Sequence, residues 1–208
     1  VDTIVNADVI ASAAVNLGIG STLDGNLTTA SPTTTANVTG IVTLGANSSV
    51  SGYILTDGGA VTVGASGFVG GRITTQAGVV TLGADVEVLG GISTGAGAVT
   101  VGDGGRTVGG GITTSAGVVT LTTNVKIDGD IWTRGGAITI GARSSTCGSV
   151  ISTGAGVVTL GADVKIGGSI NSIAGAITVN AGSTVGGDII STGAGVVTLT
   201  AVHVGGQV

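Results

Sequence analysis

Side chains that carry chemistry or fill a thick core are nearly missing from this 208-residue sequence. It contains one cysteine, one histidine and one proline, no methionine, and one residue each of tryptophan, tyrosine and phenylalanine. The single cysteine, Cys147, excludes an intramolecular disulfide. His203 is the only histidine, so a Ser-His-Asp site is not expected, and the acidic residues are scattered rather than clustered as metal ligands are. We therefore expect a protein that is not an enzyme and that holds neither a metal nor a cofactor.

Charge is also scarce, at 8% of residues with a net charge of −5. No basic stripe is present, so nucleic acid is not expected as a partner. No apolar run reaches the roughly 18 residues that a membrane-spanning helix needs. The chain begins at Val1 without a signal peptide, which favours a secreted, extracellular protein whose leader has been removed, an artificial start being the alternative.

Glycine and aliphatic residues are abundant instead. Glycine accounts for 43 residues and the hydrophobic fraction is 42%. A disordered chain would be richer in charge and poorer in β-branched residues, and no Gly-X-Y period indicates collagen. Such a composition can build only a thin core, which suits stacked coils.

One tripeptide, an aliphatic residue on each side of threonine, repeats along the chain at steps of about 19–20 residues. Fixed periods of about 20 residues are typical of solenoids. The same frame extends backwards through Thr22 and Thr3. The repeated threonines are Thr43, Thr62, Thr81, Thr100, Thr120, Thr139, Thr159, Thr178 and Thr198.

Valine, isoleucine, threonine and glycine favour strands and turns over helices, and the pattern of leucine-rich repeats is missing. We predict an all-β chain, a single β-solenoid (β-helix) of about 10–11 coils with about 19–20 residues and three strands per coil. It forms one domain over residues 1–208, with irregular coils in 1–40 and regular coils in 41–208. The segment "TTASPTTTANVTG", residues 28–40, is the one loop-like insertion, either a surface loop or a fragment of a cap.

Strand parity predicts which columns of the repeat face outward. Residues i and i+2 of a strand share a face, so the aliphatic neighbours of each repeated threonine point inward and the threonine points outward. The residue two before each threonine also points outward, and this column reads Ile41, Ala60, Val79, Ala98, Val118, Ala137, Val157, Ala176 and Val196.

Two further columns are predicted to face inward, and a third, of hydroxyl residues, to face inward or to line a corner. The first contains Val50, Val69, Val88, Val108, Ile127, Cys147, Ile166 and Val185, which makes Cys147 a small buried hydrophobe rather than a reactive thiol. The second contains Ile54, Ile73, Ile92, Ile112, Ile131, Ile151, Ile170 and Ile189 or Ile190. The hydroxyl column contains Thr56, Thr75, Thr94, Thr114, Thr133, Thr153, Ser172 and Thr192, and neighbouring glycines are expected to supply corner conformations that other residues resist.

A two-coil alternation overlies the repeat. Alanine alternates with valine in the outward column, and leucine alternates with valine or isoleucine after the threonine. Duplication of a two-coil unit would produce it, but the sequence supplies no physical reason.

The face that bears the repeated threonines differs from the other two. It has no charged residue, whereas the other outward positions include Asp85 and Glu87 on one strand and Arg72 and Trp132 on another.

Strands of neighbouring coils lie about 4.7–4.9 Å apart and outward neighbours about 6.6–6.8 Å apart. The result is a two-column lattice of hydroxyls and methyls, close to the repeats of ice. We predict that these threonines and the outward Ala/Val column bind ice or another periodic surface. Packing of this face against another copy, and plain exposure of strand-forming threonines, are the alternatives.

Residues 41–86 carry the phrases "VTLGANSS", "AVTVGA", "GGRI" and "GVVTLGAD", which resemble the last coils of microbial ice-binding proteins, secreted three-faced β-solenoids. The resemblance implies an extracellular antifreeze or recrystallisation-inhibiting role. That family also carries a long α-helix beside the solenoid. The best candidate here, "NADVIASAAVNLG" at 6–18, reads equally well as a coil.

A second function of a different class follows from the ends of the chain. Solenoids need polar caps to remain soluble, and none is visible in the sequence, so copies could stack end to end. The turns "DGDI" at 128–131 and "GGDI" at 186–189 weakly resemble bactofilin-type polymers. The alternative prediction is therefore a secreted self-assembling filament or adhesin stalk.

Overall fold

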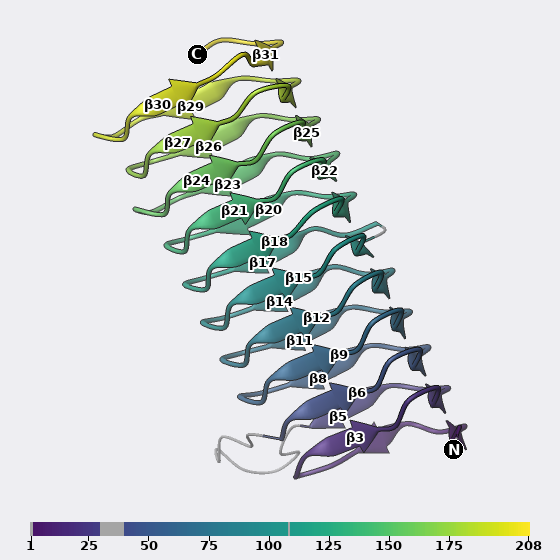
Figure 1. The fold of residues 1–208 in the computed structure, drawn as a ribbon. Coiled ribbons are helices and arrows are strands. Elements are labelled where there is room, and N and C mark those ends of the chain that lie inside the picture. The colour runs from purple at the N-terminus through teal and green to yellow at the C-terminus, as the bar shows by residue number, and fades with distance from the viewer. Residues whose placement is uncertain (1, 30–39, 108) are drawn as a thin grey trace.

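The computed structural model describes residues 2–29, 40–107 and 109–208, and these residues form a single β-solenoid without a helix. Figure 1 shows the coils stacked into a rod with the two termini at opposite ends. Each coil contributes one short parallel strand to each of three sheets, which we name A, B and C in the order in which the chain visits them. The predicted fold class is confirmed.

Sheet A has eleven strands within the described residues, and each has two residues with one side chain inward. They are β1 (Ile4–Val5), β4 (Thr22–Leu23), β7 (Ser49–Val50), β10 (Phe68–Val69), β13 (Glu87–Val88), β16 (Arg106–Thr107), β19 (Lys126–Ile127), β22 (Ser145–Thr146), β25 (Lys165–Ile166), β28 (Thr184–Val185) and β31 (His203–Val204).

Sheet B has ten strands in the described part of the chain, and most place two inward side chains on either side of one outward side chain. They are β2 (Val9–Ile10), β5 (Leu27–Thr29), β8 (Ile54–Thr56), β11 (Ile73–Thr75), β14 (Ile92–Thr94), β17 (Ile112–Thr114), β20 (Ile131–Thr133), β23 (Val150–Ser152), β26 (Ile170–Ser172) and β29 (Ile189–Ser191).

Sheet C also has ten strands over the same residues, and from β6 onward each is the aliphatic-Thr-aliphatic tripeptide. They are β3 (Val15–Leu17), β6 (Val42–Leu44), β9 (Val61–Val63), β12 (Val80–Leu82), β15 (Val99–Val101), β18 (Val119–Leu121), β21 (Ile138–Ile140), β24 (Val158–Leu160), β27 (Ile177–Val179) and β30 (Val197–Leu199).

The corner between sheets B and C is built on a column of glycines. A Cβ atom on any glycine from Gly59 onward in this column would lie 1.8–2.2 Å from the carbonyl oxygen of the glycine one coil earlier. These glycines do not have positive φ angles, so the prediction that they supply unusual corner conformations is wrong. They are required because two backbones approach too closely for a side chain. The column is Gly59, Gly78, Gly97, Gly117, Gly136, Gly156, Gly175 and Gly195.

The predicted hydroxyl column satisfies the backbone of this same corner. The buried Thr56 and Thr133 hydroxyls each donate to the glycine carbonyl three residues later at 2.7 Å. The buried threonine hydroxyls of this column are therefore hydrogen-bonded, and each bond ties the corner to the strand before it.

The corner between sheets C and A contains one left-handed residue in each coil. Its φ angle is 56–59° in Asn47, Asp85, Asn124 and Asp163, residue types that tolerate this conformation better than most. The complete column is Gly20, Asn47, Ser66, Asp85, Gly104, Asn124, Arg143, Asp163, Gly182 and Ala201.

Core packing supplies a physical reason for the inward half of the two-coil alternation. Coils with Leu82 or Leu121 after the threonine place a buried valine, Val86 or Val125, at the next corner. In the intervening coil, the Val101 Cγ1 atom lies 2.6 Å from the position of a Cβ on Gly105, which leaves no room for a side chain there. Over these coils, large and small layers therefore alternate along the axis and interdigitate, whereas Leu44 is followed by the small buried Ser48.

The inward assignments of Cys147 and Ile151 are wrong, because the extra residue of a longer coil lies at a different corner than predicted. Thr146 takes the register position given to Cys147, and Val150 takes that of Ile151. Cys147 is exposed. Thr107 likewise takes the position given to Val108, which lies outside the described residues. The buried threonines donate to backbone carbonyls, so a hydrophobic pattern does not detect them.

The same displacement affects two members of the predicted hydroxyl column. Ser152 and Ser191 replace Thr153 and Thr192, and Ile189 rather than Ile190 faces inward. The remaining members of the column are confirmed.

The N-terminal frame also differs from the prediction. Asn16, not Thr22, pairs with Thr43, so this coil is longer than those that follow, whereas Thr22 lies in sheet A. The first two residues of the predicted insertion at 28–40, Thr28 and Thr29, belong to β5, and its residues 30–39 lie outside the described part of the chain. Residues 6–18 form β2 and β3, as expected of a coil.

Candidate functional site

Sheet C presents nine threonines in a single unbroken column. From Thr43 to Thr198, each repeated threonine pairs directly with the threonine of the next coil, and Asn16 precedes the column. All nine side chains are exposed or half-buried. Thr81, Thr139 and Thr198 are the exposed members.

Two further columns flank the threonines on the same surface. The residue two before each threonine is outward as predicted: Val79 and Val118 are 43% and 42% exposed, and the alanines are half-buried. The residue two after each threonine forms a column that sequence reasoning missed, namely Gly45, Gly64, Gly83, Gly102, Thr122, Gly141, Gly161, Asn180 and Thr200. We name these three columns together the threonine face. None of their residues is charged.

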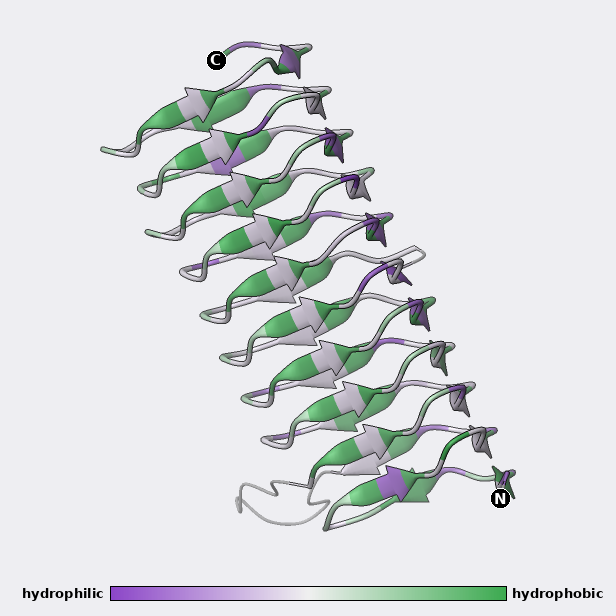
Figure 2. Cartoon of the chain, viewed as in Figure 1, coloured by the Kyte–Doolittle hydropathy of each residue, from purple (hydrophilic) through white to green (hydrophobic). Residues whose placement is uncertain are grey.

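The outward positions of the other two sheets are irregular. In sheet A they hold Glu87, Arg106 and Lys126 in succession, with an ion pair of 3.6 Å between Arg106 Nε and Glu87 Oε1. In sheet B they include Leu55, Trp132 and other unrelated residues. Figure 2 shows the same hydrophobic and neutral banding from strand to strand on sheet C from β6 onward, while hydrophilic residues are scattered over the rest of the rod. Regularity is therefore confined to one face.

Geometry and side-chain stiffness together make the threonine face a lattice. Hydrogen-bonded strands repeat at about 4.7–4.9 Å, and alternate residues along a strand at about 6.6–6.8 Å. Threonine is β-branched, so its χ1 angle is restricted and its methyl and hydroxyl groups hold fixed positions. The lattice continues over nine coils without insertion within the described residues.

Asp103 lies at the edge of the threonine face, at the corner that also holds the carboxylates of Asp85 and Asp163. Asp103 follows β15 at the corner toward sheet A, and its pKa is lowered by hydrogen bonds from the Thr122 hydroxyl and from the Thr123 backbone, whose N–H donates at 3.1 Å. The carboxylate is therefore ionised at neutral pH and marks the charged edge of an otherwise uncharged surface.

The described residues contain no cluster of His, Cys, Asp and Glu that could hold a metal ion. Within that same part of the chain, no helix is long and apolar enough to cross a membrane.

No protein-family model, curated protein or solved structure matches the chain. The resemblance to microbial ice-binding proteins and to bactofilins therefore rests on the short phrases of the sequence.

Proposed function

We propose that the protein binds ice through the threonine face and acts outside the cell as an antifreeze or recrystallisation inhibitor. The observation that carries the proposal is the register of the nine threonines, which repeat without exception in sheet C while both other faces vary. A ligand that is itself periodic benefits from every member of such a column, whereas a small ligand would need only a few.

The chemistry of the face supports a solid water surface as the ligand. Threonine hydroxyls hydrogen-bond water and their methyl groups, together with the alanines and valines beside them, exclude bulk water. Because the side chains project from a hydrogen-bonded sheet, they lose little conformational entropy when the surface is bound. Charged groups, which order water in shells unlike ice, are absent from the three columns.

The test is a pair of tyrosine variants within one coil. Thr120→Tyr places a ring in the middle of the threonine face, and Thr113→Tyr places the same ring on the exposed outward position of β17 in sheet B. We expect Thr120→Tyr to abolish ice recrystallisation inhibition and thermal hysteresis, because the ring holds neighbouring coils away from the lattice. Thr113→Tyr should retain both activities, and circular dichroism should show unchanged β-structure in both variants. If Thr120→Tyr and Thr113→Tyr show equal ice recrystallisation inhibition and thermal hysteresis, the proposal is wrong.

Self-assembly into a filament, with coils of neighbouring copies stacked end to end, is the second candidate. Val5, Val15, Leu199 and Val204 are only partly buried, whereas their counterparts in inner coils are fully covered. Stacking a second copy would bury them and pair the strand edges. Sheet A has one strand more than sheets B and C. If β31 of one copy paired with β1 of the next, sheets B and C would therefore each have a gap of one strand at the joint.

Electron microscopy of dilute protein separates the candidates. Filaments that vanish in Leu199→Lys but persist in Thr120→Tyr would support assembly through the terminal coils. Monomeric rods that arrest ice growth would exclude filament formation as the function under these conditions.

A further inference from the structure

The corner between sheets A and B contains a ladder of polar side chains that is interrupted at one place. At most coils, the side chain at this corner accepts a hydrogen bond from the backbone N–H of the corner residue one coil later. Asp130 accepts from Ser149 at 2.7 Å, the Ser149 hydroxyl from Ser169 at 3.1 Å, and the Ser169 hydroxyl from Asp188 at 3.0 Å. Near the N-terminus, Asn26 accepts from Tyr53 in the same way, at 3.1 Å.

The ladder is interrupted over four consecutive coils, at Tyr53, Arg72, Gly91 and Gly111, and the two glycines have no side chain that could accept a bond. Tyr53 and Arg72 are the two members of this gap that carry side chains. They occupy equivalent corner positions, since Leu27 N–H donates to the Tyr53 carbonyl and Ile54 N–H to the Arg72 carbonyl. Neither side chain accepts a bond from the next coil, and no residue in the described part of the chain accepts the Arg72 backbone N–H. Two side chains are thus released from the structural role that their column has elsewhere.

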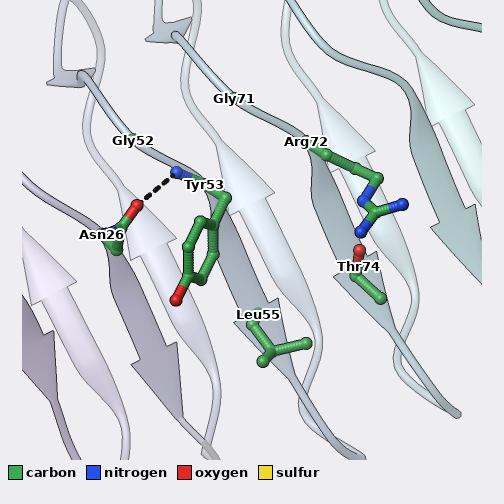
Figure 3. A pocket seen from close by; sticks show the side chains of 7 residues that line it. All are labelled: Asn26, Gly52, Tyr53, Leu55, Gly71, Arg72 and Thr74. Atoms are coloured by element: carbon green, nitrogen blue, oxygen red, sulfur yellow. Dashed lines mark hydrogen bonds between the residues drawn. The ribbon is translucent and has the colours of Figure 1, made fainter.

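The released side chains border an open hollow on sheet B. Its volume is about 670 Å³, within the range of small-molecule sites, and its lining comprises Asn26, Gly52, Tyr53, Leu55, Gly71, Arg72 and Thr74. Figure 3 shows the Tyr53 ring and the Arg72 guanidinium extending on the same side of the sheet, with Leu55 and Thr74 beside them. Gly52 and Gly71 line one border of the hollow and have no side chains, so this border stays open.

The chemistry of the hollow is that of an anion site with an apolar platform. Arg72 is exposed and forms no ion pair among the described residues, although the protein as a whole carries a net charge of −5. A guanidinium pairs with carboxylates in bidentate geometry, and the free backbone N–H of the same residue is a further donor on the main chain. Tyr53 is 43% exposed, and its ring offers a flat face. Tyr53 and Arg72 lie in neighbouring coils, which are about 4.8 Å apart along the rod.

We propose that this hollow binds an acidic saccharide, a hexuronate unit whose carboxylate pairs with Arg72 and whose ring packs on Tyr53. A pyranose ring has the size of one coil step and presents C–H groups to an aromatic face, while its hydroxyls can reach Thr74 and the Arg72 amide. The hollow is open along the rod, so a longer chain can extend beyond the bound unit. The site lies on sheet B, and it is independent of the threonine face on sheet C.

Isothermal titration calorimetry with trigalacturonate, compared with the neutral galactose trimer, tests the proposal. We expect the acidic trimer to bind and the neutral trimer to bind at least about tenfold more weakly, as loss of a charge-assisted pair predicts. Arg72→Ser should reduce the affinity for trigalacturonate by at least about tenfold, and Tyr53→Ser by about fivefold or more.

Matched controls exist within the chain. Serine already occupies the same corner at Ser149 and Ser169, so both variants should fold, and Arg72→Gln removes the charge with less change of shape. Arg134→Ser removes an exposed positive charge from another corner and should leave the affinity within about twofold.

Equal binding of the acidic and neutral trimers, no binding of trigalacturonate at millimolar concentration, or an equal loss in Arg134→Ser would each overturn the proposal. Ice activity should be unchanged in Arg72→Ser, so the two functional proposals can fail separately.

Discussion

Replacing Gly136 by alanine tests the glycine column that holds neighbouring coils together. The new Cβ would lie 1.9 Å from the carbonyl oxygen of Gly117 and 2.5 Å from its carbonyl carbon. Ordinary contact begins at 3.4 Å, so the two backbones would have to separate by about 1.5 Å. The adjacent sheet C bond from Val119 N–H to the Ala137 carbonyl, at 2.9 Å, would then exceed hydrogen-bonding distance.

We expect this substitution to lower the free energy of unfolding by about 3 kcal/mol or more, at or above the upper end of the cost of overpacking a core. For a chain of this length, such a loss lowers Tm by roughly 6–12 °C. Thermal denaturation followed by circular dichroism measures the shift, and hydrogen exchange should show the loss of protection centred on β18 and β21.

The neighbouring residue, Gly135, supplies the control. A Cβ at Gly135 meets no atom within 4 Å, and its φ angle is not positive, so Gly135→Ala should be neutral or stabilise the fold by about 0.4–1 kcal/mol. If Gly136→Ala unfolds within about 0.5 kcal/mol of the parent protein, close backbone approach is not the reason for the column.

Three further outcomes are expected. Thr133→Val removes the hydroxyl that donates to the Gly136 carbonyl and should cost about 1–3 kcal/mol in denaturant unfolding; an unchanged midpoint would mean that water replaces the bond. Cys147 should react with a maleimide or with Ellman's reagent in the folded protein, and a thiol that reacts only in denaturant would restore the buried assignment. Because Thr122 lowers the Asp103 pKa, this carboxylate stabilises the fold above about pH 3.8, and the stabilisation is lost as the pH falls through the lowered pKa. The difference in Tm between the parent protein and Asp103→Asn should therefore shrink in acid. A difference that grows in acid would refute this role of Asp103.

The repeat period and the facing of the threonine column could be read from the sequence because both depend on local rules. Strand parity places Thr120 outward between two buried aliphatic residues, and a nearly constant period stacks one such threonine on the next. The Val118 column follows from the same parity.

The register of the other columns could not be derived in the same way. Some coils carry one residue more than the others, and hydrophobicity alone placed the extra residue before Cys147 and Ile151. In the structure the extra residue follows Ser152, and Thr146 faces inward in place of Cys147. The buried Thr146 hydroxyl is tolerated because it donates a hydrogen bond to a corner carbonyl, as it would to solvent.

The sequence by itself therefore determined the solenoid, its period and the regular threonine face, since these follow from composition and from spacing along the chain. Only the tertiary structure decided why Gly136 must be glycine, why large and small core layers alternate, and that Tyr53 and Arg72 border one hollow. Each of these depends on the contact between one coil and the next, where atoms one full repeat apart in sequence meet across a gap of about 4.8 Å.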